Sequence, residues 1–334
     1  MTSRRRFIKH TGLAISALAI PFTIQNILKN SYMKNPDIFD VIIIGGSYSG
    51  LSAAMALGRS LRHVLVIDGG LPCNRQTPHS HNFLTQDGST PQEISALAKK
   101  QVEMYSSVAF FNGTAVSGEK TTEGFVIQMQ SEEKFKSKKL IFATGIKDIM
   151  PDIKGFKECW GTSVIHCPYC HGYEYRNQRT AIMANGERLV HFVPLIKNLT
   201  SHITILTNGP VALTQEQISA FENRHINILD YEAEEIKHDN KQLKNILFKN
   251  GESIACDVLY ASLPFEQHSG IPVSLGCELT ESGHIKTDPF QKTTIEGIFA
   301  CGDNSSPMRS VANALAGGNL AGAMVNMELS HGLF

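Results

Sequence analysis

The 334-residue sequence lacks an excess charge of either sign, since Lys and Arg total 31 and Asp and Glu total 31. It also lacks a basic stripe with interleaved aromatic residues, so composition gives no support to a nucleic-acid partner. Neither a solenoid-type repeat nor a low-complexity segment is present. What is present, 42% apolar and 19% charged residues, is typical of a folded enzyme with two domains.

Cysteine is scarce, and only Cys167 and Cys170 of the seven cysteines form a C-x-x-C pair. A structural zinc site usually takes two close ligand pairs, and here a second pair is missing. With His171 the pair also fits the C-x-x-C-H attachment site of a c-type haem, and two buried structural thiols are a further interpretation. We favour a redox-active disulfide, because two cysteines at this spacing can form a reducible disulfide.

A dinucleotide fingerprint begins the folded part of the sequence. Residues 40–54 pass from an apolar strand through a glycine-rich turn into a small-residue helix, the context that such a fingerprint requires. Gly45 permits the tight turn and Gly50 permits close packing of helix on strand, while Ser47 replaces the usual middle glycine. A second apolar strand ends at Asp68, near the spacing expected of a carboxylate that holds a ribose hydroxyl.

Two later strands end in short motifs, A-T-G at residues 143–145 and G-D at residues 302–303. With these motifs the sequence resembles the two-dinucleotide-binding flavoproteins, and their order around the C-x-x-C resembles the low-molecular-weight thioredoxin reductases in particular. The resemblance covers about residues 36 to 330. It implies an α/β fold with two Rossmann-like three-layer domains, an FAD cofactor and a homodimer.

The resemblance also implies the domain boundaries and the cofactor site. The FAD-binding domain would comprise residues 36–149 and 265–334, split in sequence by an NAD(P)-binding-like domain over 150–264 that carries the C-x-x-C. His81 and Asn82 match a segment that lies against the flavin ring in oxidase-like relatives. His79 and His81 form an H-x-H pair without an evident third ligand, so no metal is expected. The implied FAD-contacting residues are Gly45, Gly46, Ser47, Ser49, Gly50, Asp68, His81, Asn82, Ala143, Thr144, Gly145, Gly302, Asp303, Arg309, Ser310 and Val311.

The second copy of the strand, turn and helix pattern, at residues 180–190, departs from the family. It keeps one convincing glycine, Gly186, and Glu187 places a negative charge where a pyrophosphate would otherwise sit. The next strand, 203–206, is not followed by the basic cluster that holds a 2′-phosphate in the family. NAD(P)H binding is therefore doubtful.

The residues C-P-Y-C-H-G-Y-E at 167–174 are similar to the active site of gliotoxin and holomycin dithiol oxidases. This resemblance implies that Cys170 faces the flavin, that Cys167 exchanges with substrate sulfur, and that His171 acts as a general base. A polar surface histidine is the simpler interpretation of His171. Three functions stay open: a reductase fed by NAD(P)H or another donor, a dithiol oxidase that discharges to oxygen or a quinone, and a flavin redox sensor. The substrate would be a thioredoxin-like protein or a small dithiol or disulfide.

The N-terminal residues 1–35 are interpreted as an export signal and linker. Residues 3–9 resemble the S-R-R-x-F-x-K twin-arginine signal, which carries folded, cofactor-loaded proteins. The apolar stretch 12–24 is too short to span a bilayer comfortably, and Ala17-Leu18-Ala19 offers a cleavage site. We expect a periplasmic or membrane-anchored protein; a cytoplasmic protein with a basic leader is the alternative.

Local patterns predict the antiparallel parts of each half. Strands are expected at 125–129 and 139–142, with the charged residues 134–139 forming a solvated turn. Asn250-Gly251 predicts a hairpin between strands at 243–249 and 253–262. A helix is expected from about Val311.

Overall fold

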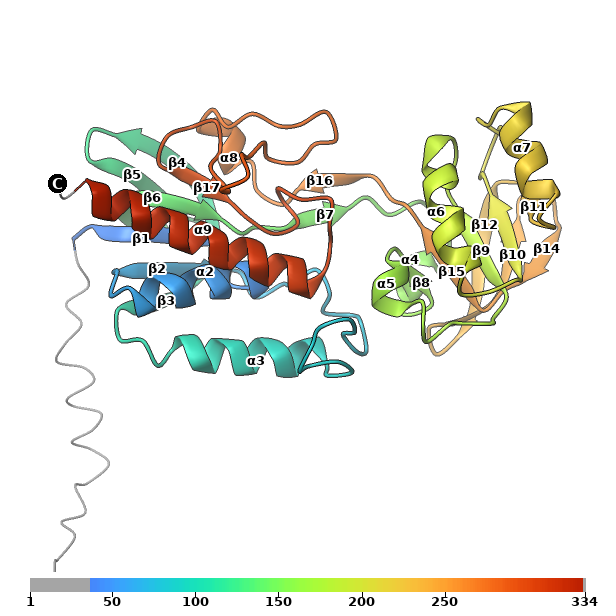
Figure 1. Ribbon diagram of the computed structural model, residues 1–334, viewed down its shortest axis with the longest axis horizontal. Coiled ribbons are helices and arrows are strands. Elements are labelled where there is room, and N and C mark those ends of the chain that lie inside the picture. The colour runs from blue at the N-terminus through green and yellow to red at the C-terminus, as the bar shows by residue number, and fades with distance from the viewer. Residues whose placement is uncertain (1–36, 333–334) are drawn as a thin grey trace, which may run out of the picture. The chain divides into compact units, whose positions relative to one another are not determined.

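The computed structural model describes residues 37–332 (Figure 1). The predicted twin-arginine leader lies outside the described residues. Within the described part of the chain, no helix combines the length and the apolar character needed to cross a membrane.

The first lobe is built on a sheet with the strand order β3-β2-β1-β6-β5-β4, and β17 also pairs with β6. β1, β2, β3, β6 and β17 are parallel, whereas β4, β5 and β6 form an antiparallel meander. The strands are β1 (Phe39–Ile44), β2 (Val64–Asp68), β3 (Val108–Asn112), β4 (Ala115–Thr121), β5 (Gly124–Met129), β6 (Lys134–Phe142) and β17 (Ile298–Ala300).

Alternate residues of the buried strands face opposite sides, as a pleated strand requires. Val41 and Ile43 pack against α2 (Tyr48–Arg59), α3 (Pro91–Val102) and α9 (Val311–His331). Ile42 packs instead with Ile127 of the meander, in the part of the core that also contains α8 (Ile271–Ser274). The result is a three-layer lobe in which α9 runs beside α2 (Figure 1).

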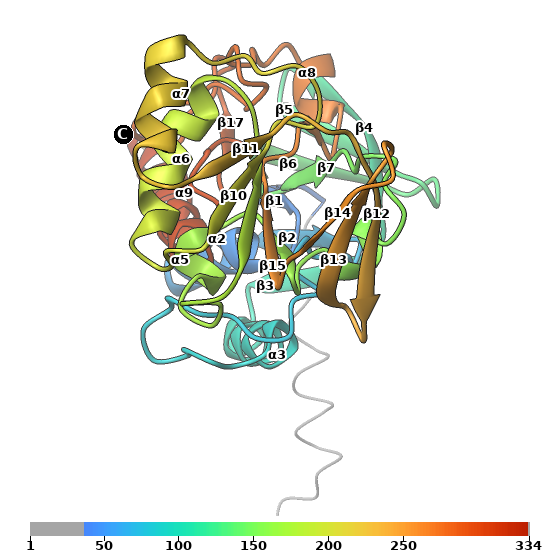
Figure 2. The same cartoon turned by 90° about the vertical axis from the view of Figure 1, so that its right-hand side faces the viewer.

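The second lobe repeats this plan with a parallel sheet of order β11-β10-β9-β15-β8 and an antiparallel sheet of order β12-β13-β14. Ala181 and Met183 pack on the antiparallel sheet, and Ile182 packs on α6 and α7. Figure 2 shows α6 and α7 on one side of the parallel sheet and the antiparallel strands on the other. The elements are β8 (Val164–Ile165), β9 (Thr180–Met183), α6 (Glu187–Lys197), β10 (Ile203–Leu206), α7 (Gln215–Glu222), β11 (Asn227–Leu229), β12 (Ala233–Asp239), β13 (Gln242–Phe248), β14 (Ser253–Ala255) and β15 (Val258–Ala261).

The chain passes between the two lobes along a two-stranded antiparallel ribbon of β7 (Ile146–Asp148) and β16 (Phe265–Gln267). Two short helices, α4 (Phe156–Cys159) and α5 (Pro168–His171), follow the first passage. The sheet of the first lobe therefore combines strands β1 to β6 with β17, which comes after the second lobe in the sequence. The predicted α/β fold with an interrupted first domain is confirmed. The residue boundaries at 149/150 and 264/265 stay predictions.

Two local predictions are wrong. Residues 134–139 are not a solvated turn but the first part of β6, because their alternate side chains are half-buried or buried and the backbone pairs with β5. The strand expected at 253–262 is two strands, β14 and β15, which belong to different sheets. The chain leaves the hairpin at Cys256, whose side chain is buried between the two sheets. The helix expected from Val311 is confirmed as α9.

Candidate functional site

The turn between β1 and α2 is shaped by glycine. Gly45 adopts a φ of +109°, and a side chain there would collide with the carbonyl group of Ala143. A side chain at Gly50 would collide with the carbonyl oxygen of Gly45. The backbone N–H of Gly46 donates to Asp68 Oδ1 at 3.2 Å, which ties the turn to the end of β2. The glycines thus bring helix α2 close to the sheet.

Helix α2 offers unpaired donors at its start. Its N-cap residue, Ser47, makes no side-chain cap hydrogen bond, and the first turn contains no acidic residue. By contrast, α3 begins with a capping box formed by Thr90 and Glu93. An uncapped helix N-terminus of this kind can bind a phosphate through its free N–H groups and the positive end of the helix dipole.

A cavity of about 150 Å³, open to solvent, extends from this turn to the C-x-x-C pair. The first lobe supplies the start of α2, the loop that follows β2, the strand end at Ala143, and the start of α9. The second lobe supplies Trp160, His166 and the disulfide region.

The cavity collects many of the predicted site residues. Those that line it are Ser47, Ser49, His81, Ala143, Gly145, Cys170, His171, Asp303, Arg309, Ser310 and Val311. The predicted residues that are not in its wall are Gly45, Gly46, Gly50, Asp68, Asn82, Thr144, Cys167 and Gly302.

Some of the predicted residues outside the cavity wall lie directly behind residues that form it. Thr144 Oγ1 accepts a hydrogen bond from Asn304 Nδ2 at 3.2 Å, and Gly302, at φ +87°, leaves room for Ser49. The backbone N–H of Asn82 donates to Asp87 Oδ1 at 2.8 Å within its own loop. The structure therefore gives Asn82 a loop-shaping position rather than a place in the cavity wall.

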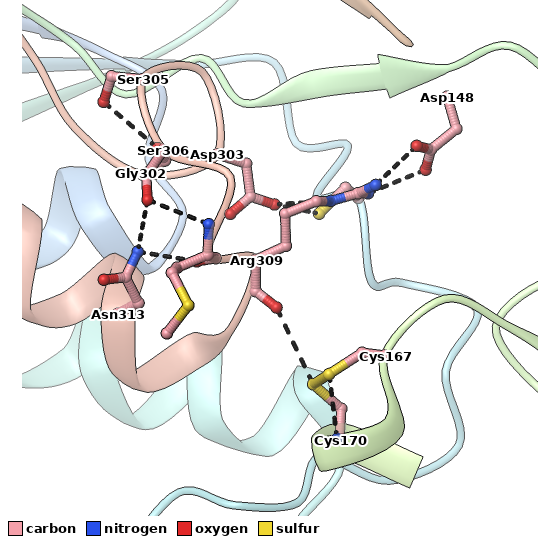
Figure 3. Close-up of polar contacts among 11 residues, drawn as sticks. Asp148, Cys167, Cys170, Gly302, Asp303, Ser305, Ser306, Arg309 and Asn313 are labelled. Atoms are coloured by element: carbon pink, nitrogen blue, oxygen red, sulfur yellow. Dashed lines mark hydrogen bonds and ion pairs between the residues drawn. A yellow bond between two sulfur atoms is a disulfide. The ribbon is translucent and has the colours of Figure 1, made fainter. Parts of the chain in front are cut away.

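A charged cluster closes one side of the cavity (Figure 3). Arg309 donates to both carboxylate oxygens of Asp148, at 2.8 and 2.9 Å, and its Nε lies 3.6 Å from Asp303 Oδ2. Burial works against the charge of Arg309, yet the two carboxylates hold its pKa above the usual value. Burial raises the pKa of Asp303, and Arg309 opposes that rise. One guanidinium thus links the segment just before α9 to the ribbon strand β7.

Cys167 and Cys170 form a disulfide with Cα atoms 5.3 Å apart. The backbone N–H of Cys170 donates to Cys167 Sγ at 3.1 Å, a contact that stabilises a thiolate on Cys167 when the disulfide opens. Cys170 Sγ lies 3.9 Å from the carbonyl oxygen of Arg309 and faces the cavity (Figure 3). The two sulfurs therefore have different surroundings, with Cys170 beside the opening of α9.

Two neutral histidines flank the disulfide. Burial lowers the pKa of His166 to about 3, and its ring stacks on Trp160 with centroids 5.9 Å apart. Burial also lowers the pKa of His171 to about 4, opposed by the nearby Glu174 carboxylate and reinforced by His81. An uncharged imidazole can accept a proton, so His171 is in the correct state for a general base at neutral pH.

The corresponding turn of the second lobe, between β9 and α6, is closed by its own side chain. Asn185 Oδ1 accepts from the N–H groups of Gly186 and Ala212, each at 2.9 Å, and Asn185 Nδ2 donates to the carbonyl oxygen of Pro210 at 2.8 Å. Glu187 is the first residue of α6. Asn185 therefore already occupies the N–H groups of Gly186 and Ala212 at this turn, and the Glu187 carboxylate stands in the first turn of α6.

The first lobe fits a bound FAD, whereas the turn between β9 and α6 in the second lobe does not fit a second dinucleotide. The glycine cradle and the uncapped start of α2 suit a diphosphate, and the open cavity that runs from there to the disulfide leads a bound cofactor toward Cys170. The residues that would hold the diphosphate are Ser47 and Ser49 with the α2 amides, and those near the ring would be Ala143, Gly145 and the start of α9. Among residues 37–332, no three His, Cys, Asp or Glu side chains are grouped to hold a metal ion.

Comparison with known proteins agrees with this geometry. A family model described as pyridine nucleotide-disulphide oxidoreductase matches residues 39–318. The thioredoxin reductase tcpT of Claviceps purpurea is 32% identical over 311 residues, which cover 89% of this chain and 96% of that protein. An oxidoreductase structure from Agrobacterium tumefaciens is 35% identical with a TM-score of 0.82, covering 88% of this chain and 99% of the other. The structure of HlmI is 26% identical with a TM-score of 0.84, covering 90% and 95%.

The chain belongs to the pyridine nucleotide-disulphide oxidoreductase family. Within that family it is a thioredoxin reductase-like enzyme, an oxidoreductase that acts on sulfur groups, and membership implies FAD as its cofactor. The predicted resemblance is thereby confirmed.

The sequence analysis missed several residues of the cavity. His166 immediately precedes the C-x-x-C, so its position was a usable signal. Asp148 and Trp160 carry no motif, and only the folded chain brings Asp148 to Arg309. Tyr48 also lines the cavity; its hydroxyl accepts from Asn74 Nδ2 at 3.1 Å and donates to the carbonyl oxygen of Pro91 at 3.3 Å.

Proposed function

We propose that this enzyme oxidises a dithiol at the Cys167–Cys170 disulfide and passes the electron pair to FAD without NAD(P)H as donor. The observation that carries the proposal is Asn185, whose amide side chain fills the turn where a second dinucleotide would be held. The loop after β10 also supports the proposal. Asn208 Oδ1 accepts from the N–H of Ala233 at 2.7 Å, and the loop has no basic side chain to hold a 2′-phosphate.

The chain's own residues account for the sulfur chemistry. His171 accepts the proton of a substrate thiol, and the resulting thiolate attacks Cys167 Sγ, which breaks the Cys167–Cys170 bond and leaves a thiolate on Cys170. The second substrate thiol gives its proton to His171, which has by then released the first proton, and attacks its partner sulfur. This step releases the substrate as a disulfide and leaves thiolates on Cys167 and Cys170. FAD, when bound, supplies a two-electron acceptor beside Cys170. An external oxidant such as dioxygen or a quinone receives the electrons at the end of the cycle.

A second candidate is a reductase in which NAD(P)H supplies the electrons and a disulfide receives them. The order of the motifs and the similarity to tcpT, which is named a thioredoxin reductase, favour it. A flavin redox sensor without turnover is a third candidate. The Asn185 contacts in the second turn are our reason for proposing the oxidase before the reductase.

Anaerobic mixing of the purified flavoprotein with dithiothreitol or with NADPH separates the three. We expect dithiothreitol to bleach the oxidised flavin absorbance and NADPH to leave it unchanged. Bleaching by NADPH within seconds would contradict the proposal and support the reductase, and bleaching by neither would support the sensor. A Cys170→Ser variant is the control, because without Cys170 the electron pair has no path from Cys167 toward the cavity.

We propose a dithiol as substrate, either a small molecule or a thioredoxin-like protein. Tyr169 and Tyr173 are each 67% exposed near the disulfide and give any substrate an aromatic surface. Bleaching rates with dithiothreitol and with reduced thioredoxin distinguish the two. By analogy with the family we also propose a homodimer, which light scattering of the purified protein tests.

We propose export by the twin-arginine route, on the basis of the N-terminal motif alone. Export of a folded protein suits an enzyme that acquires its cofactor in the cytoplasm. A reporter fused after residue 35 tests it, since replacing Arg4 and Arg5 with Lys should retain the reporter in the cytoplasm. Unchanged export of that variant would refute this route.

A further inference from the structure

One histidine of the cavity, His81, stands between two carboxylates. Its Nδ1 lies 3.6 Å from Asp87 Oδ1, and its Nε2 lies 3.6 Å from Glu174 Oε1. Asp87 belongs to the loop of the first lobe, whereas Glu174 follows the C-x-x-C helix. His81 therefore joins the two lobes through a pair of close electrostatic contacts next to the disulfide.

The three side chains differ in how far they reach solvent. The side chain of His81 is 22% exposed, that of Glu174 is 38% exposed and that of Asp87 is 66% exposed. Both His81 and His171 line the cavity. The series of groups thus leads from the cavity beside the disulfide to a carboxylate that is mostly in water.

His171 needs such a path, because its surroundings oppose a positive charge. Burial holds the pKa of His171 at about 4, and Glu174 is the one neighbouring group that favours the protonated form. A proton taken from a substrate thiol therefore cannot stay on His171, and it must leave before the next turnover. At the 3.6 Å separations of Glu174 from His81 and of His81 from Asp87, proton transfer runs through small side-chain movements or a bridging water.

We propose that Glu174, His81 and Asp87 form the proton outlet of His171, with Glu174 as the first acceptor. The inference rests on the proposed dithiol oxidation, in which each substrate molecule loses two protons and two electrons. His171 takes a proton from a sulfur; Glu174 accepts it from His171; His81 passes it to Asp87, and Asp87 releases it to water. The electron pair follows the separate path through Cys167 and Cys170 to FAD.

Other charged or titratable groups near this series do not offer an equivalent path. His79 has its ring 6.4 Å from that of His81, and its Nδ1 is paired with the carbonyl oxygen of Gly88 at 2.9 Å. His166 is more deeply buried than His171, and Arg309, which lowers the pKa of His166, is paired with Asp148. Glu174 is thus the carboxylate that contacts His81 and that also favours the protonated form of His171.

Buffer rescue of a Glu174→Gln variant tests the outlet. The glutamine keeps the shape of the side chain and cannot carry a proton. In anaerobic mixing with dithiothreitol in a weakly buffered solution near neutral pH, we expect flavin bleaching to slow by about 10- to 100-fold. Added imidazole should restore most of the rate, because a small base can collect the proton from the open cavity. Glu174→Asp should retain part of the rate without imidazole.

Glu222→Gln, on the exposed face of α7, is the matched control and should bleach like the native protein. A Glu174→Gln variant that bleaches at the native rate, or that is slow and not rescued by imidazole, would overturn the outlet. The solvent deuterium isotope effect is an independent readout, expected to rise in Glu174→Gln only. If the native protein itself is not bleached by dithiothreitol, the proposed function has failed, a result distinct from failure of the variant alone.

Discussion

The two lobes present the same turn in opposite states. Between β1 and α2 the turn is lined by glycine, and the first turn of the helix contains no acidic residue. Between β9 and α6 the corresponding place is filled by Asn185, and the helix starts with Glu187. A shared topology therefore does not give a shared site: one hydrogen-bonding side chain and one charge are sufficient to close a phosphate-binding turn.

The lobes also differ in how they hold an arginine–aspartate pair. Arg309 and Asp148 are 18% and 8% exposed and stand at the cavity, whereas Arg179 and Asp257 are 54% and 30% exposed at the surface of the second lobe. Both pairs have two short contacts. The same kind of ion pair is therefore buried in one lobe and exposed in the other. Comparing the two pairs shows how burial changes the contribution of an ion pair to stability.

The largest expected effect comes from adding one methyl group to the open turn. In Gly50→Ala the new side chain collides with the carbonyl oxygen of Gly45, so helix α2 must move off the sheet. We expect FAD to bind at least about 100-fold more weakly, so that the protein purifies with little flavin. The ratio of flavin to protein absorbance measures it. Gly186→Ala, in the closed turn, should keep its flavin, and equal loss in both variants would contradict the comparison.

The next effect concerns the two ion pairs. Asp148→Asn leaves the buried charge of Arg309 without its main partner, which should lower the free energy of unfolding by about 3 kcal/mol. Asp257→Asn breaks the exposed pair and should cost about 1 kcal/mol or less. Urea unfolding of both variants measures the difference. Equal losses would mean that burial of Arg309 and Asp148 does not matter to stability.

The disulfide region should also make stability depend on pH. The pKa values of His166 and His171 in the folded state, about 3 and about 4, lie below the value of about 6.5 in an unfolded chain. As the pH falls below about 6.5, the unfolded state binds protons first, so stability falls toward acid and is retained above that value. The slope is at most about 1.4 kcal/mol per pH unit for each histidine. His171→Gln should reduce the slope in urea titrations; an unchanged slope would refute this assignment.

The smallest effect comes from reopening the closed turn. The double variant Asn185→Gly with Glu187→Gln frees two amides and removes one negative charge from the start of α6. We expect NADPH to bind about threefold to tenfold more tightly than to the native protein. Fluorescence titration with NADPH measures it, with Glu216→Gln at the start of α7 as the control. No change would mean that the second lobe is closed by more than these two residues.

Local patterns predicted the elements that are defined by neighbouring residues. The strand, turn and helix of the first lobe, the helix from Val311 and the C-x-x-C pair each depend on spacing within a short segment, and the fold class followed from their order. The prediction failed at residues 134–139, because a segment with five charged or polar residues among six does not show that the backbone pairs with β5 and that alternate side chains are buried or half-buried.

The sequence by itself determined that this chain carries a dinucleotide turn, a redox-type cysteine pair and a second, altered turn, because glycine, cysteine and charge act through positions close in the chain. Only the tertiary structure decided that Asp148 pairs with Arg309 and that His81 stands between Glu174 and Asp87. It also decided that Asn185 closes the second turn by reaching Pro210 and Ala212. These contacts join segments far apart in sequence, and their geometry is set by how the sheets and helices pack, which no local pattern encodes.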